Sequence, residues 1–198
     1  RVGVVKEFMG DGLDPEVSKA VKESIEALRK QGHEVVEISL PSIGLALAAY
    51  YIIVPAEVSS NLSRYDGQRY GYSKSSPNDL YDSYAASRGI GFNAENKRRI
   101  MIGTYVLSSG YYDAYYKQAQ KVRTLIRQDY DRVFQEVDIL LTPTSPTVAF
   151  KLGEKTSDPL AMYLADIFTV SANIAGIPGL NVPIGSIDGL PVGMQLLG

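Results

Sequence analysis

The feature of this sequence that most constrains its fold is a long amphipathic segment that runs directly into a short buried one. Apolar side chains recur at steps of three and four across residues 111–136, which is typical of a helix with one buried face. Residues 138–142 (DILLT) form an apolar run that is too short for a helix and is stopped by Pro143. Because so short a link joins helix and strand, the sequence predicts an α/β layer. The predicted buried stripe of the helix is Tyr112, Tyr115, Ala119, Val122, Ile126, Tyr130 and Val133.

A second helix is predicted immediately before this segment. Asn93 is placed to cap its first turn, and Gly110 interrupts the chain after it. The helix carries the only Lys-Arg-Arg run of the sequence at residues 97–99. Arg99 lies on the side of the helix that continues into apolar residues. We therefore expect its stem to be at least partly buried.

The chain begins with a predicted β-α-β unit. Strand 2–5 is followed by a helix that Asp14 caps and Pro15 starts. Gly32 stands where a left-handed residue ends a helix, and residues 33–40 form the next strand. We expect the two strands to be parallel and the connection right-handed.

The rest of the chain continues as alternating helices, loops and strands. The predicted elements are a helix at 42–62 containing Pro55, a surface loop at 64–77, a short helix at 78–87, a helix at 160–175 with Asp158 as its N-cap, and strands 181–184 and 192–197 joined by a turn at 188–189.

Composition excludes several classes of function. The 198 residues fit one domain, and the net charge of −2 gives no general attraction to nucleic acid or anionic lipid. Cysteine is absent, and the single histidine, His33, follows a helix end, where a surface position is expected. No nucleotide-binding glycine motif, zinc motif or calcium loop is present, so the sequence predicts no cofactor for this chain. We find no apolar run of about 20 residues and no signal peptide, and we expect a cytoplasmic protein.

Both ends of the sequence are strand-like. Residues 2–5 read as a central strand, and residues 193–198 read as a strand with nothing to cover it. Because natural sheets hide or blunt such edges, we expect the sequence to be a piece of a longer chain.

Two charged residues stand apart from the solvated helix faces. Arg99 has a partly buried stem, and Asp166 lies in the most apolar acid-bearing window of the chain. A buried charge must be paired, so each residue either pairs with protein neighbours or faces a ligand. A zwitterionic ligand would offer its carboxylate to Arg99 and its ammonium to Asp166. From the residues alone, the structural pairing is the favoured interpretation.

Pro55 should kink or split its helix beside Tyr50 and Tyr51. Such a kink could aim a tyrosine at a pocket. The alternative is that both rings pack at the surface with their hydroxyls in water, and the residues alone favour this alternative.

Four segments nevertheless resemble a known family. SSNLSRYDGQRYG, RRIMIGTYVLSSGYYDAYYKQAQKVRTLI, DILLTPTSPT and NIAGIPGLNVPIG are similar to the later half of amidase-signature enzymes. The tyrosine-rich block resembles, more narrowly, the glutaminase subunits (A subunits) of glutamyl-tRNA(Gln) amidotransferases. The resemblance covers essentially the whole chain. It implies an α/β fold with a mixed β-sheet flanked by helices, incomplete here, so that residues 1–198 form a single partial domain.

The resemblance also implies a function and a set of substrate-binding residues. In such subunits, glutamine is hydrolysed to release ammonia for conversion of Glu-tRNA(Gln) to Gln-tRNA(Gln). Arg99 matches the arginine that binds the glutamine carboxylate, Asp166 the aspartate that binds its α-amino group, and Tyr50 a tyrosine of the same pocket. The implied partners are two other amidotransferase subunits and, through them, the tRNA.

The chain departs from the family in its catalytic residues. Family catalysis uses a Ser–cis-Ser–Lys triad in a Gly/Ser-rich segment, and no such segment occurs in these residues. The serine pairs at 59–60, 75–76 and 108–109 lack the glycine context and a strand-borne lysine. We therefore predict that this chain supplies substrate recognition and no catalytic nucleophile.

Two alternatives to the amidotransferase glutaminase remain. One is the corresponding part of an amidase that acts on a different amide. The other is a non-catalytic binding or scaffold domain, whose mark would be a closed sheet without large exposed apolar edges.

Overall fold

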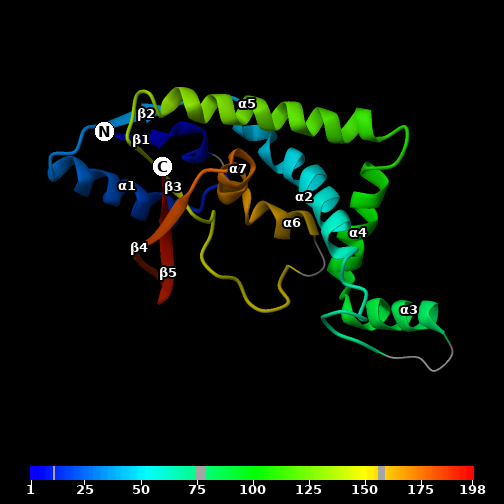
Figure 1. The fold of residues 1–198 in the computed structure, drawn as a ribbon. Coiled ribbons are helices and arrows are strands. Elements are labelled where there is room, and N and C mark those ends of the chain that lie inside the picture. The colour runs from blue at the N-terminus through cyan, green and yellow to red at the C-terminus, as the bar shows by residue number, and fades with distance from the viewer. Residues whose placement is uncertain (11, 75–78, 156–158) are drawn as a thin grey trace. The chain divides into compact units, whose positions relative to one another are not determined.

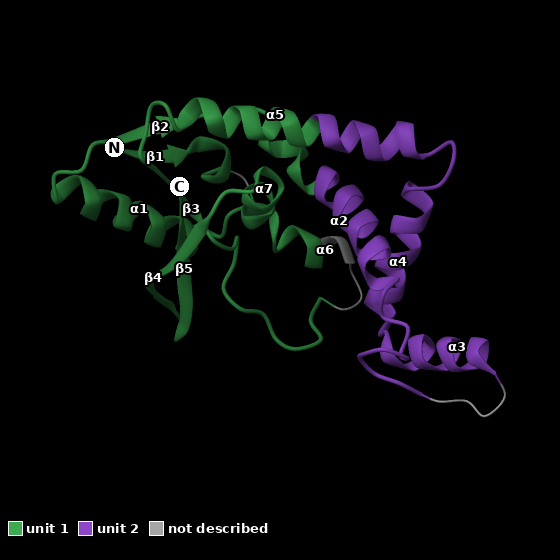
Figure 2. Ribbon diagram, viewed as in Figure 1, with its two compact units in different colours: residues 1–47, 122–198 green, residues 48–121 purple. Residues whose placement is uncertain are grey.

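The computed structural model describes residues 1–10, 12–74, 79–155 and 159–198. These residues form two compact units, the first comprising residues 1–47 and 122–198 and the second residues 48–121 (Figure 2). The prediction of one partial domain over residues 1–198 stays a prediction.

The first unit contains a mixed β-sheet. Its strands are β1 (Val2–Val5), β2 (Val35–Ile38), β3 (Ile139–Pro143), β4 (Gly179–Ile187) and β5 (Leu190–Leu197), in the order β2-β1-β3-β5-β4 (Figure 1). β1 pairs in parallel with β2 and β3, whereas β5 runs antiparallel to β3 and β4. The predicted α/β class with a mixed sheet is therefore confirmed, as are the parallel pairing of the first two strands and the last hairpin. Asp188 and Gly189 turn that hairpin with positive φ angles of 51° and 78°, as a type I′ turn requires.

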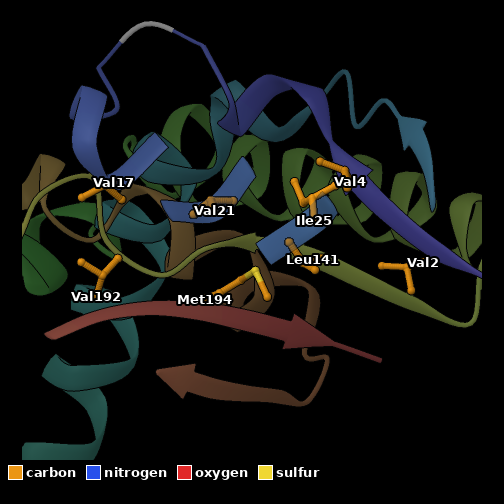
Figure 3. Close-up of a cluster of buried hydrophobic side chains, with 8 residues drawn as sticks. All are labelled: Val2, Val4, Val17, Val21, Ile25, Leu141, Val192 and Met194. Carbon is orange, nitrogen blue, oxygen red and sulfur yellow. The ribbon is translucent and has the colours of Figure 1, made fainter. Parts of the chain in front are cut away.

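Helix α1 (Pro15–Lys30) packs on this sheet. Asp14 caps it as predicted, because its carboxylate accepts hydrogen bonds from the Glu16 and Val17 amides. A cluster of buried side chains joins the helix to the strands (Figure 3). Burying each such aliphatic side chain contributes about 1.5–3 kcal/mol, so this cluster is a main source of stability for the unit. Its members are Val2, Val4, Val17, Val21, Ile25, Leu141, Val192 and Met194.

Helix α5 (Lys117–Val133) buries part of its predicted stripe. Ala119, Ile126, Tyr130 and Val133 are buried, and the Tyr130 hydroxyl shares a 2.9 Å hydrogen bond with Ser171 Oγ. The predicted burial of Tyr112 and Tyr115 is wrong, since both are exposed. They lie in a π-helical turn, η3 (Tyr112–Tyr116), whose wider winding shifts side chains away from the 3.6-residue stripe.

The predicted helix at 160–175 is two helices, α6 (Pro159–Leu164) and α7 (Ile167–Ala175). Residues 165 and 166 form the turn between them, and α7 ends at Gly176 with a positive φ of 75°. The predicted N-cap Asp158 lies outside the described residues. So do the first residue of the helix predicted at 78–87 and residues 75–77 of the predicted loop. Two 3₁₀ turns, η1 (Lys6–Phe8) and η2 (Ile43–Leu45), complete the helices of the first unit's described residues.

The described residues of the second unit contain helices and no strand. The helices are α3 (Leu80–Gly91), α4 (Ala94–Val106), most of α2 (Ala46–Leu62), η3 and the first residues of α5. Asn93 caps α4 as predicted by accepting a hydrogen bond from the Asn96 amide, and Gly110 has a left-handed φ of 88°. The segment 64–74 contains no helix or strand, in agreement with the predicted loop.

The sequence has no uninterrupted apolar run of about 20 residues, but the structure contains one helical stretch of that length. η2 and α2 together form a helical stretch, Ile43–Leu62, of 20 residues whose length and apolar composition would allow it to cross a membrane. The apolar run is interrupted by Pro55 and Glu57, which is why counting uninterrupted residues missed it. One such helix is weak evidence, because core helices of soluble proteins have the same composition.

α2 and α4 approach each other closely at Gly103. A Cβ atom built on Gly103 would lie 1.9 Å from the Pro55 carbonyl oxygen and 2.7 Å from Ser59 Cβ. Only glycine allows two helix backbones to come this close.

We predict that Gly103→Ala lowers the free energy of unfolding by about 1–3 kcal/mol, because the added methyl group must push the two helices apart. Gly89→Ala in α3 is the matched control. No atom lies within 4 Å of a Cβ at Gly89, so alanine there should raise helix stability by up to about 1 kcal/mol. Denaturant unfolding of the two variants measures both values, and equal stability of the two variants would contradict the close contact.

Candidate functional site

Arg99 projects from α4 and is held by an acidic residue of its own helix. Its side chain is 25% exposed, so the predicted partial burial is confirmed. Its Nε donates a 2.8 Å hydrogen bond to Glu95 Oε1, one turn earlier. The second Glu95 oxygen, Oε2, accepts a hydrogen bond from Nη1 of Arg98. One carboxylate therefore holds both arginines of the run.

Two tyrosines of α2 complete the surroundings of Arg99. Tyr50 interacts electrostatically with the guanidinium and helps to raise its pKa, and the Arg99 Cζ atom lies 5.8 Å from the centre of the Tyr51 ring. The two rings contact each other edge to face, with their centres 5.2 Å apart. The structure thus brings together Tyr50 and Arg99, two of the three predicted site residues.

This arrangement favours the ionised forms of both partners. The hydrogen bond from Arg99 lowers the pKa of Glu95, and partial burial offsets this only in part. Burial of Arg99 works against its charge, but its hydrogen bond to Glu95 and its interaction with Tyr50 outweigh burial and raise the pKa of the guanidinium. Arg99 is therefore a permanent cation suited to an anionic ligand.

A cavity of about 520 Å³ lies beside this cluster in the second unit. Arg99 and Glu95 contribute charged groups from α4, and α2 contributes apolar valines together with a second acid, Glu57. The lining residues are Val54, Glu57, Val58, Asn61, Leu62, Glu95, Asn96 and Arg99.

Asp166 belongs to the first unit, and the prediction that it is buried among apolar neighbours is wrong. Its side chain is exposed, because α6 ends before it and it occupies the turn that starts α7. Its backbone carbonyl accepts hydrogen bonds from the Thr169 and Val170 amides. Within the described part of the chain, its carboxylate has no hydrogen-bond or ion-pair partner. The grouping of Asp166 with Arg99 and Tyr50 therefore stays a prediction.

The residues on either side of Asp166 line a second cavity of about 520 Å³, within the first unit. Its walls are mostly apolar, with Glu7 and Lys155 as the charged residues. Glu7 is already engaged, since its carboxylate accepts hydrogen bonds from the Ser39 hydroxyl and the Leu40 amide. The apolar contributors are Phe8, Pro41, Ile43, Leu47, Pro146, Leu164, Ile167 and Phe168.

One hydroxyl in each of two serine pairs has a hydrogen-bond partner. Ser59 Oγ shares a 2.9 Å hydrogen bond with Thr104 Oγ1, and Ser108 Oγ donates to the Tyr105 carbonyl. Neither hydroxyl is bonded to a lysine. Residues 75 and 76 lie outside the described part of the chain.

The sequence interpretation missed Glu95. Its signal was present, because a glutamate three and four residues before two arginines places all three side chains on one helix face. Charges in apolar sequence windows indicate burial, but Glu95 lies in a polar first turn and does not meet that criterion.

We predict that the Glu95 carboxyl titrates below the ordinary glutamate value of about 4.3, and that Arg99→Ala raises its pKa toward that value. A pKa lowered by folding means that the pair stabilises the fold above pH of about 4.3 and that this stability is lost as pH falls through the lowered pKa. Carbon-13 NMR of the side-chain carboxyl across a pH titration measures the midpoint. Equal midpoints in the two proteins would show that the ion pair is absent in solution.

Comparison with known proteins identifies the family. The Amidase family matches residues 1–198. The A subunits of the glutamyl-tRNA(Gln) amidotransferases of Thioalkalivibrio sulfidiphilus and Persephonella marina are each 59% identical over 198 residues, which is all of this chain and 41% of each relative. The chain thus spans about 41% of the length of these curated relatives.

Solved structures agree with this assignment. The crystal structure of the glutamyl-tRNA(Gln) amidotransferase A subunit from Thermotoga maritima is 39% identical, with a TM-score of 0.73 over all of this chain and 38% of that one. An amidase crystal structure shares the fold at 24% identity, with a TM-score of 0.74 over all of this chain and 41% of that one. The resemblance read from the sequence segments is confirmed: the chain belongs to the amidase-signature family, within which it is similar to glutamyl-tRNA(Gln) amidotransferase A subunits.

Proposed function

We propose that residues 1–198 form the substrate-recognition half of a glutaminase subunit of glutamyl-tRNA(Gln) amidotransferase. The complete subunit hydrolyses glutamine, and the ammonia converts Glu-tRNA(Gln) to Gln-tRNA(Gln). Two kinds of observation support this proposal: the family relationship along the whole chain, and the half-buried Arg99 held between Glu95 and two tyrosines.

The observation that carries the proposal is how Arg99 is paired. Its one ion pair with a described carboxylate, that of Glu95, is made through Nε. The two terminal nitrogens are left to form two parallel hydrogen bonds with a ligand carboxylate. Arg99 accordingly binds the α-carboxylate of glutamine, and the Tyr50 hydroxyl flanks the same group. Asp166, exposed and without a described partner for its carboxylate, binds the α-ammonium group.

The catalytic step takes place on residues that this chain does not supply. A Ser–Lys mechanism needs a serine hydroxyl whose proton passes to an unprotonated lysine, and the hydroxyls of Ser59 and Ser108 are bonded to other groups. In this proposal the chain binds and orients glutamine, and neither Ser59 nor Ser108 is the nucleophile. The chain requires no cofactor of its own. The complete subunit works in the cytoplasm with two other subunits, and it meets tRNA through them.

We predict that Arg99→Ala raises KM for glutamine about 10- to 100-fold, because a charge-assisted hydrogen bond to the substrate is worth about 1.5–3 kcal/mol. The experiment uses a chimera in which residues 1–198 replace the matching segment of the T. sulfidiphilus protein, assembled with its partner subunits. Arg99→Lys should recover only part of the affinity, because lysine lacks the planar fork. Ammonia release against glutamine concentration is the measurement.

The matched control is Arg127→Ala, which removes an exposed arginine from α5 and should leave KM unchanged. If Arg99→Ala also leaves KM for glutamine unchanged, the substrate carboxylate is not bound by Arg99. Such a result would favour the alternative that this chain is the corresponding part of an amidase that acts on a different amide.

We also predict that the 198-residue chain alone releases ammonia from glutamine only at the background rate, while the chimera turns over. The same assay measures both proteins. Turnover by the isolated chain at a rate comparable with the chimera would show that a nucleophile is present within these residues and would overturn the division of roles.

A further inference from the structure

Glu95 contacts Arg99 at one defined edge of the guanidinium. Glu95 Oε1 accepts the Nε hydrogen bond at 2.8 Å, while Oε2 is held by Arg98 Nη1. Both carboxylate oxygens are therefore fixed, and the carboxylate cannot rotate without breaking one of the two bonds. The three residues share one face of α4 at spacings of three and four.

The opposite edge of Arg99 is the one left for a ligand. A guanidinium can bind a carboxylate through Nε and one terminal nitrogen, or through both terminal nitrogens. Glu95 occupies the first edge, and the Tyr51 ring lies near the guanidinium carbon at 5.8 Å. A substrate carboxylate at the Nε edge would also meet the negative charge of Glu95. One binding orientation remains, through the terminal nitrogens.

We infer that Glu95 is a positioning residue for substrate binding, which orients Arg99 so that its terminal nitrogens meet the α-carboxylate of glutamine. This inference rests on the proposed function. Glu95 itself makes no contact with glutamine, and it acts through the arginine. Arg98, at 50% side-chain exposure, anchors the other oxygen of Glu95 and keeps the carboxylate in place.

For a variant without the Glu95 charge, electrostatics alone predicts a lower KM for glutamine, whereas loss of positioning predicts a higher KM. Removing a negative charge next to an anion-binding site should tighten the binding of an anion. Loss of positioning should weaken it, because the long arginine side chain is then free to adopt other rotamers. The direction of the change in KM therefore distinguishes the two roles.

The test uses the chimera, with Glu95→Ala and Glu95→Gln, and two substrates. Glutamine carries the α-carboxylate, and 4-aminobutanamide has hydrogen in its place. We expect Glu95→Ala to raise KM for glutamine about three- to tenfold with kcat within about twofold, an effect in the range of a single hydrogen bond. Glu95→Gln keeps an acceptor oxygen and should recover part of this loss. Neither variant should change KM for 4-aminobutanamide.

Glu16→Gln is the matched control, since Glu16 is likewise a glutamate in the first turn of a helix, α1, and is exposed. It should leave both substrates unaffected. In Arg99→Ala, a second change at Glu95 should have no further effect on KM for glutamine, because the group that it positions is gone. Circular dichroism of each variant reports whether α4 is intact, and variants that keep their helix content are compared.

The outcomes separate this inference from the proposed function. If Arg99→Ala raises KM for glutamine and Glu95→Ala lowers it or leaves it unchanged, Glu95 does not position Arg99, and the proposed function still holds. If Arg99→Ala has no effect on glutamine, the proposed function fails and the inference fails with it. Equal changes for both substrates in Glu95→Ala would show a general structural effect and would also overturn the positioning role.

Discussion

The close crossing of α2 and α4 at Gly103 is the contact on which the candidate site depends. Arg99 and Tyr50 lie on different helices, and they meet because the α4 backbone reaches the Pro55 carbonyl with no side chain between them. Any larger residue at Gly103 would widen the gap between the helices. A widened gap would move the guanidinium away from Tyr50 and from the Tyr51 ring, whose centre lies 5.8 Å from the Arg99 Cζ atom.

This crossing also explains how a half-buried cation is tolerated. A guanidinium taken partly out of water needs compensation, and Glu95 supplies it through its hydrogen bond to Nε, with a further contribution from Tyr50. This compensation does not use all of the hydrogen-bond donors of Arg99, because a guanidinium has five N–H donors. A purely structural ion pair would gain by engaging the remaining donors with protein groups. The donors left at the terminal nitrogens are the physical basis for assigning Arg99 to a ligand.

The sequence was informative where local rules decide the structure. The Asn93 cap, the left-handed Gly110 and the hairpin turn at 188–189 follow from residue chemistry within a few positions, and the structure contains each of them. The predictions were wrong where the chain departs from a regular α-helix. A π-helical turn moved Tyr112 and Tyr115 to the surface, and a break between two helices exposed Asp166.

The candidate site was predictable in part. Arg99 could be singled out as a partly buried cation, and family resemblance pointed to Tyr50, whereas residue chemistry alone favoured a surface role for that tyrosine. Glu95 required attention to spacings of three and four within a polar turn. The pairing of Tyr50 with Arg99 depends on two helices that are more than 30 residues apart in sequence, and no local pattern encodes such a contact.

The most direct test of this account is a crystal structure of the chimera with glutamine bound, in a form that cannot turn over. The account predicts the α-carboxylate within about 3 Å of both terminal nitrogens of Arg99, with Nε still bonded to Glu95 and the α-ammonium within hydrogen-bonding distance of Asp166. A structure in which Arg99 and Asp166 face separate surfaces, each bonded only to protein groups, would contradict it.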